Sequence, residues 1–209
     1  GNGGGGKYSY NDGATYTGDY YDAFGENWGP RTNGQPVKVF NSDGVAVPFE
    51  AAPDNVRNFF QTGVSTNNNV SISHADENGD FRFSGTQLNR RGIVPNTDLN
   101  RNTLQTSMGK KLFNNRLEFR ANAMYVGSSS DNVPNAGYDE SSSVMYSFLW
   151  LPRNTPIDDL RDYWKPGQEN VQQSYVEELW GNNPWLIVNE NTNSFNASRL
   201  LGDINDTYQ

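Results

Sequence analysis

The sequence lacks side chains on which several classes of protein function depend. It contains no cysteine among its 209 residues, which excludes disulfides, thiolate metal sites and cysteine nucleophiles within them. His74 is the only histidine, so no metal site with several histidine ligands can form here. We therefore expect His74 to be a structural residue at the rim of a hairpin.

Apolar residues are also scarce. They make up 34% of the chain, and the mean hydropathy is -0.81, which is low for a packed globule. No apolar run approaches the roughly 20 residues of a membrane helix, so closed β-structure is the remaining route if the chain lies in a membrane. The aromatic content of 13% argues against disorder.

Basic residues are outnumbered by acidic ones, and the formal net charge is -8. This balance disfavours nucleic acid and acidic lipid as partners. The acidic residues also form no convincing reactive site, because Glu177 and Glu178 are adjacent and would point in different directions on a helix. The segment Asp76–Asp80 has oxygen ligands, but Gly79 stands in the wrong place for an EF-hand loop. We expect a tight turn there, and neither enzyme activity nor a cofactor.

The pattern that is present is a two-residue hydrophobic period in four segments, at 69–73, 81–84, 103–108 and 117–125. Such a period gives a strand one apolar and one polar face. We predict that one face carries Phe81, Phe83, Leu104, Leu117, Phe119 and Ala121. The opposite face would carry Arg82, Gln105, Glu118, Arg120 and Asn122.

The connections between these segments alternate in length. Residues 76–79 and 113–115 are tight polar turns, whereas 90–101 is a longer link. Short turns that alternate with long loops, with strands near ~9–11 residues, are typical of the wall of an outer-membrane barrel. A soluble sandwich sheet with one solvated face would give the same alternation.

The remaining segments predict short elements around these strands. Pro53 at the first helical position, Asp54 in the first turn and Gly63 past the end indicate a helix over 54–61. Other helices are expected at 142–149 and, with Thr155 as N-cap and Pro156 at the first position, at 158–164. Short strands are expected at 37–40, 184–188 and 200–208. In the last of these Asp206 shares the apolar face, which indicates either a place at the membrane rim or a shifted register.

Aromatic side chains are concentrated in the presumed loops. Their flat faces suit sugar rings, and their bulk equally suits packing against a partner or the barrel rim. The candidate ligand-contact or partner-contact residues are Trp28, Tyr138, Tyr146, Trp150, Tyr163, Trp164, Trp180 and Trp185.

Several phrases of the sequence, in their order and spacing, resemble the SusC/RagA family of TonB-dependent outer-membrane transporters. The central phrases are NVRNFFQTG at 55–63, NNVSIS at 68–73, FRFS at 81–84 and GIVPNTDL at 92–99. Flanking matches are WGPR at 28–31 with Gly34, residues 125–132, WLPR at 150–153, NP at 183–184 and ENTN at 190–193. The resemblance covers nearly the whole chain.

The resemblance implies an all-β fold: an antiparallel transmembrane β-barrel wall segment with long extracellular loops that carry short helices. Residues 1–65 would be an extracellular loop, 66–127 the barrel hairpins, 128–196 a long extracellular loop and 197–209 the start of the next strand. The whole barrel would have about 22 strands and a plug N-terminal to Gly1.

The implied function is TonB-dependent uptake of a glycan or peptide across the bacterial outer membrane. A SusD-like lipoprotein would cover the barrel mouth, TonB would act through the plug, and outer-membrane lipid would surround the wall. A soluble carbohydrate-binding β-domain is the alternative.

Overall fold

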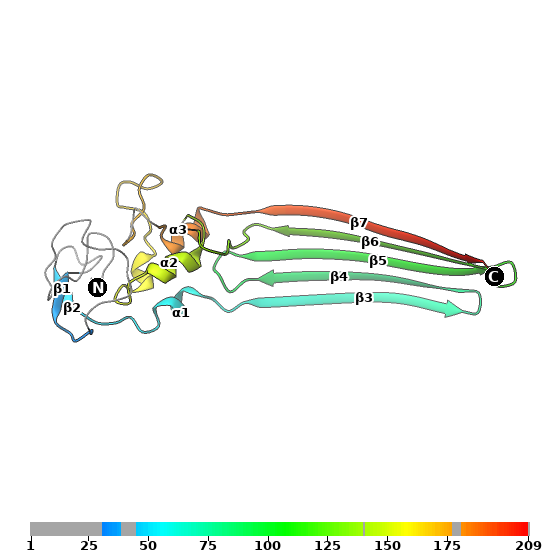
Figure 1. The fold of residues 1–209 in the computed structure, drawn as a ribbon, viewed down its shortest axis with the longest axis horizontal. Coiled ribbons are helices and arrows are strands. Elements are labelled where there is room, and N and C mark those ends of the chain that lie inside the picture. Colours follow the sequence, from blue (N-terminus) through cyan, green and yellow to red (C-terminus); the bar gives the residue numbers. More distant parts are fainter. Residues whose placement is uncertain (1–30, 39–44, 140, 177–180, 209) are drawn as a thin grey trace. The chain divides into compact units, whose positions relative to one another are not determined.

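The chain folds into two compact units in the computed structural model (Figure 1). The structure describes residues 31–38, 45–139, 141–176 and 181–208. One unit is formed by residues 62–133 and 193–209 and is called here the sheet unit. The other is formed by residues 1–61 and 134–192 and is called the helical unit.

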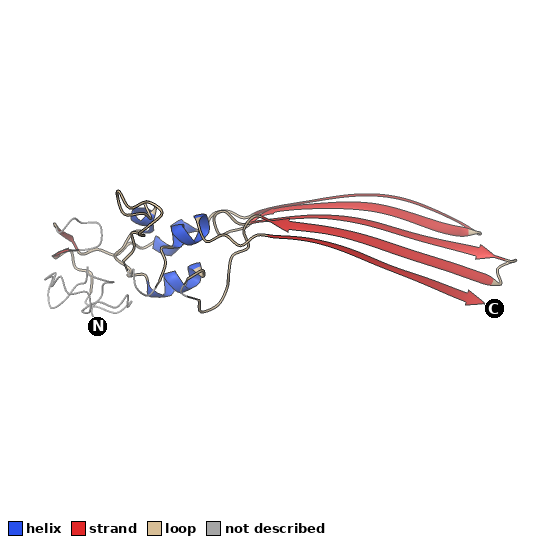
Figure 2. Ribbon diagram, turned by 90° about the horizontal axis from the view of Figure 1, so that it is seen from above, coloured by secondary structure: helices blue, strands red, loops and turns tan. Residues whose placement is uncertain are grey.

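The sheet unit consists of one antiparallel sheet. Its strands lie in sequence order, each hydrogen-bonded to the next, and the sheet is open, with β3 and β7 at its edges (Figure 1). The strands are β3 Val64–Asp76, β4 Gly79–Arg91, β5 Asp98–Leu112, β6 Leu117–Ser130 and β7 Phe195–Tyr208. They curve gently along their length (Figure 2). The predicted hairpins are confirmed, and the fold is mostly β with few helices.

Both predicted tight turns are present, at what we call the turn end of the sheet. In the first, Asp76 pairs with Gly79, and Asp76 Oδ1 accepts hydrogen bonds from the amides of Asn78 and Gly79, at 2.8 and 3.0 Å. Gly79 has no room for a side chain, because a Cβ there would collide with the carbonyl oxygen of Gly109. In the second turn Phe113, Asn114 and Asn115 all have positive φ, a conformation that asparagine tolerates better than most residues.

The opposite end of the sheet is called the loop end. The link there occupies only residues 92–97, because β4 and β5 extend further than the alternation predicted. The chain also leaves β6 and returns to β7 at this end.

The predicted division of side chains between two faces is confirmed by the register. Phe81 pairs with Met108, Met108 with Ala121 and Ala121 with Ile204, so these side chains share one face. Arg82, Ser107, Asn122 and Asp203 form the neighbouring row on the other face. We call these the apolar face and the polar face.

β7 begins at Phe195, five residues earlier than predicted. Its pairing with β6 is regular from Leu117–Tyr208 to Ser130–Phe195. Asp206 therefore lies on the apolar face opposite Phe119, near the turn end, and no register shift is involved.

The helical unit contains the small sheet of β1 Pro36–Lys38 and β2 Ala46–Pro48, with α1 Asn55–Phe59, α2 Val144–Trp150, the 3₁₀ helix η2 Ile157–Leu160 and α3 Pro184–Asn189. The prediction of α1 is confirmed with shorter bounds, and that of α2 is confirmed with a start two residues later and an end one residue later. Asp54 is the N-cap of α1, so Pro53 precedes the helix instead of opening it. The predicted strand at 37–40 is seen as β1 up to Lys38, and residues 39 and 40 lie outside the described residues.

Two predictions in this unit are wrong. Residues 184–188 form helix α3 instead of a strand, because Asn183 caps it through Oδ1, which accepts from the Trp185 amide, and Pro184 opens it. The predicted helix at 158–164 is only the short η2, and Thr155 does not cap it. The chain cannot continue as a helix, since the backbone of residues 163–165 pairs with that of 172–174.

The core of the helical unit is aromatic and aliphatic. The Phe59 ring contacts those of Phe148 and Trp185 at centroid distances of 4.9 and 4.7 Å. The buried hydrophobic residues of the helical unit are Phe49, Phe59, Val144, Phe148, Leu151, Ile157, Leu160, Tyr175, Val176, Trp185, Leu186, Ile187 and Val188. Asn183 is fully buried and donates from Nδ2 to the carbonyls of Leu160 and Ser174. This side chain ties α3 to two other segments.

Among the described residues, no helix combines the length and the apolar character needed to cross a bilayer.

Candidate membrane wall and contact surface

The apolar face of the sheet carries three consecutive rows of largely apolar side chains, which we call the apolar band. Each row runs across all five strands. The rows are Val70–Gly85–Leu104–Tyr125–Leu200, Ile72–Phe83–Thr106–Ala123–Gly202 and His74–Phe81–Met108–Ala121–Ile204. Large apolar side chains in these rows are exposed, with Val70 at 77%, Leu200 at 76% and Ile204 at 69%. An exposed apolar surface that spans a whole sheet marks a contact with lipid or protein.

The band ends at the same level on every strand. In the next two rows toward the loop end, every residue is polar except Gly127. They are Asn68–Gln87–Asn102–Gly127–Ser198 and Thr66–Asn89–Asn100–Ser129–Asn196. This boundary follows one row of paired residues across five strands, and it is visible only once the register is known.

Toward the turn end, the band is followed by a mixed row and a last apolar row. The mixed row holds Phe119 between the charged side chains of Asp76, Lys110 and Asp206. The last row is Leu112–Leu117–Tyr208. From Leu104 to Leu112 the surface extends about 27 Å along β5 at ~3.4 Å per residue. A strand tilted by about 40° would then cover roughly 21 Å along the membrane normal, a little less than the ~25 Å apolar band of outer-membrane barrels.

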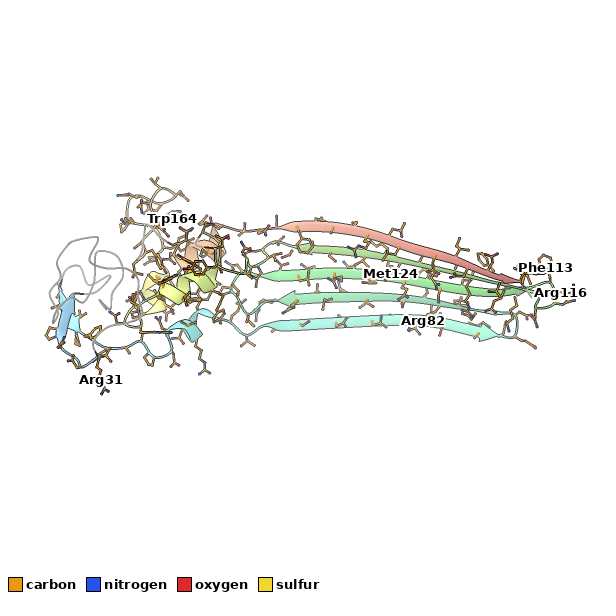
Figure 3. All side chains as sticks on the ribbon, in the orientation of Figure 1. Arg31, Arg82, Phe113, Arg116, Met124 and Trp164 are labelled. Atoms are coloured by element: carbon orange, nitrogen blue, oxygen red, sulfur yellow. The ribbon has the colours of Figure 1, made fainter. Side chains whose placement is uncertain are left out.

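The polar face is organised by ion pairs and amides that reach between strands. Arg120 on β6 contacts Asp80 on β4 at 3.1 Å, and also Glu118 at 3.2 Å. The Asp80–Arg120 pair passes over Gly109 of β5, where a Cβ would lie 2.6 Å from Asp80 Oδ1. Asn122 donates to Asp203 at 3.0 Å. Arg82 lies on the same face, nearer the turn end of the sheet than the loop end (Figure 3).

A polar cluster fixes the loop end of the sheet unit. Asp98 Oδ1 accepts from Ser130 Oγ at 3.2 Å and from the amides of Asp131 and Asn132 at 2.8 and 3.3 Å. Asn132 Oδ1 in turn accepts from the amide of Asn193 at 3.1 Å. Asp98 therefore holds together the points at which the chain leaves β6 and returns toward β7.

The helical unit brings three of the predicted contact residues together. The rings of Tyr138 and Tyr146 lie 4.8 Å apart, edge to face, and Tyr146 and Trp150 lie 6.3 Å apart. Tyr138 is 73% exposed. Beside them α2 exposes Met145 and Leu149, one turn apart. Tyr138, Met145 and Leu149 are called here the α2 outer face.

The other predicted contact residues are dispersed. Tyr163 and Trp164 form a second aromatic pair at 5.6 Å. Trp185 is 8% exposed, and its Nε1 donates to the carbonyl of Ile157, so it is a core residue and offers no free face to a ligand. Trp28 and Trp180 lie outside the described residues, as do Glu177 and Glu178.

Two titratable groups of the helical unit, Asp139 and Tyr163, have pKa values that their surroundings shift. The hydroxyls of Ser141 and Ser142 donate to Asp139 and lower its pKa to about 2. Burial and a hydrogen bond to Glu190 raise the pKa of Tyr163. Neither group is part of a reactive pair, and the described residues contain no cluster of three or more carboxylate or histidine side chains that could hold a metal.

Sequence reasoning missed three features of these surfaces. Gly109 stands inside an alternating strand, a position that can signal close approach of other groups. Asp98 lies within the phrase at 92–99 but was assigned no role. The exposure of Met145 and Leu149 depends on how α2 packs, and no local signal could have indicated it.

A scan against protein-family models gives no match, and a search of curated proteins gives none either.

Proposed function

We propose that the sheet unit is part of the wall of a SusC-like TonB-dependent transporter in a bacterial outer membrane. The apolar face would contact lipid, and the polar face would line the lumen. The exposed apolar band on one face and the ion-paired polar face behind it carry this proposal. A barrel wall between lipid and a polar lumen is expected to have this division of faces along alternating residues.

The connections support the same assignment. Short turns gather at one end of the sheet and the long connection from β6 to β7 leaves from the other, the asymmetry expected of outer-membrane barrels. The unpaired edges of β3 and β7 would be completed by further wall strands. The charged row of Asp76, Lys110 and Asp206 would lie near the membrane interface, where charge costs about 0–1 kcal/mol.

In this proposal the helical unit lies outside the membrane and meets a SusD-like lipoprotein and, with it, an oligosaccharide or peptide. TonB acts through a plug segment. The protein performs no covalent chemistry and uses no cofactor. Its role is to provide a shaped, polar passage.

The experiment compares arginine at two adjacent positions of β5. Thr106 and Ser107 are similar in size and both half-buried, but Thr106 lies in the middle row of the apolar band and Ser107 on the polar face. We expect Thr106→Arg to reduce the amount of folded protein in the outer membrane, since arginine at the midplane of the lipid face costs about 2–4 kcal/mol. Ser107→Arg should leave that amount nearly unchanged. The measurement is the fraction of protein that stays in the membrane after alkaline extraction.

Equal effects of the two substitutions would contradict the membrane assignment. So would a wild-type protein that stays monomeric and folded in buffer without detergent. Exposed Tyr138 and half-buried Tyr146 and Trp150 form an aromatic group that favours a second candidate, a soluble carbohydrate-binding β-domain. A wild-type protein that folds in buffer without detergent would select this candidate.

A further inference from the structure

The polar face carries an unusual distribution of charge along its strands. Arg90, Arg101 and Arg199 lie in three consecutive rows near the loop end, which we call the arginine zone. The two rows that are paired across all five strands are Asn67–Leu88–Arg101–Ser128–Ala197 and Asn69–Thr86–Thr103–Val126–Arg199. The row nearest the loop end holds Ser65–Arg90–Leu99 on β3 to β5 and Ser130–Phe195 on β6 and β7. No position in them is acidic. The acids of this face, Asp80, Glu118 and Asp203, all lie nearer the turn end.

The three arginines are exposed, and no ion pair of any of them occurs within the part of the chain that the structure describes. Arg101 is oriented by a hydrogen bond from Nε to Ser128 Oγ at 3.2 Å. This pattern is notable in a chain of net charge -8, where acidic partners are plentiful. By contrast, Arg120 on the same face is paired with two carboxylates.

The spacing allows the arginines to act on one ligand. Arg90 and Arg101 are diagonal neighbours on adjacent strands, about 7–8 Å apart. Arg101 and Arg199 are separated by two strand spacings and one row, or about 12 Å. The half-buried side chains of Leu88, Leu99 and Val126 lie between them, and an apolar floor strengthens the attraction of a guanidinium for a carboxylate.

We propose that the arginine zone binds carboxylate groups of an anionic ligand inside the lumen, so that the transported solute is acidic. This inference rests on the proposed function, because it requires the polar face to line a passage. Guanidinium groups bind carboxylates with paired hydrogen bonds, and arginine side chains that line a pore select anions. The carboxylates could belong to an acidic oligosaccharide or to an acidic peptide.

The test measures binding to the full-length protein in lipid nanodiscs by isothermal titration calorimetry. The probes are trigalacturonate, triglutamate and the neutral maltotriose. We expect Arg101→Gln to raise the Kd of the preferred acidic probe about tenfold, the loss of one charge-assisted contact, with a larger loss when Arg90→Gln and Arg199→Gln are added. Binding should also weaken as salt is raised.

The matched control is Arg91→Gln. Arg91 adjoins Arg90 on β4 but lies on the apolar face beyond the band, so its removal changes net charge equally. Tight binding of trigalacturonate would identify an acidic glycan as the ligand, and tight binding of triglutamate would identify an acidic peptide. Either result supports carboxylate binding by the arginine zone. Equal binding of maltotriose, or an equal effect of Arg91→Gln, would overturn it. If the variants stay in the membrane yet bind as the wild type does, only this inference fails and the wall assignment stands.

Discussion

At the scale of single residues, Gly109 shows how an absent side chain organises the polar face. Asp80 and Arg120 belong to strands that are not neighbours, and their ion pair forms only because β5 presents no Cβ between them. The pair is partly exposed, so its own contribution is small. The pair matters for the geometry of the polar face, because it fixes the side chains of Asp80 and Arg120 over β5.

We predict that Gly109→Ala disrupts this pair. The new Cβ would lie 2.6 Å from Asp80 Oδ1 and 3.3 Å from Arg120 Cζ, so both side chains must move. Gly85→Ala is the control, because its Cβ would meet only Leu104 Cδ2 at an ordinary 3.6 Å. A double-mutant cycle of Asp80→Asn and Arg120→Gln, measured by thermal denaturation, should show loss of coupling between these two residues in the Gly109→Ala background and not in the Gly85→Ala background. Coupling that survives there would contradict the role of Gly109.

At the scale of elements, the start of α2 depends on a short polar turn. Asp139 accepts from the amide and hydroxyl of Ser141, and from the hydroxyl of Ser142. Ser143 then caps the helix through a bond from the Tyr146 amide. The ionised carboxylate therefore stabilises the conformation from which α2 begins.

This arrangement predicts a pH dependence. The pKa of Asp139 is lowered from 3.8 to about 2, so its contribution to stability is present above pH ~4 and is lost as the pH falls toward 2. Asp139→Asn should lower the melting temperature of the helical unit at pH 7, and the difference from the wild type should vanish near pH 2. Asp162→Asn, at another exposed acid of this unit, is the control. A difference that is constant with pH would contradict this account.

At the scale of the whole molecule, the exposed apolar surfaces decide which partners the protein can have. The α2 outer face leaves Met145 and Leu149 about half exposed, although the unit has a packed core to receive apolar side chains. In the proposed transporter, this surface would meet the SusD-like lipoprotein. A deletion of residues 138–180 would not test this contact, because it would also expose Phe59 and Trp185 in the core and so disturb the fold of the helical unit.

We predict that Met145→Ser combined with Leu149→Ser reduces recovery of the lipoprotein several-fold in co-purification. Both side chains are more than half exposed, so the helical unit should still fold. Val171→Ser is the control, because Val171 is 81% exposed but lies outside α2. Unchanged recovery, or an equal loss with Val171→Ser, would remove this surface from the partner contact.

The hairpins, their tight turns and the faces of their strands follow from the local sequence alone. Alternation such as that of Phe81, Arg82 and Phe83 is a local property, and a two-residue turn at Glu77 and Asn78 leaves little freedom in the register. The local sequence also locates α2, which is expected at 142–149 and lies at Val144–Trp150.

The remaining features depend on contacts between segments that are distant in the sequence. The apolar run from Pro184 to Val188 is short enough for either a strand or a helix, and burial on all sides selects the capped helix. The sequence is compatible with Trp185 as a ligand-contact residue or as a core residue, and only its packed neighbours distinguish the two roles. The edge of the apolar band and the grouping of Arg90, Arg101 and Arg199 join residues up to 130 positions apart, which are brought onto one sheet only through pairing of five strands.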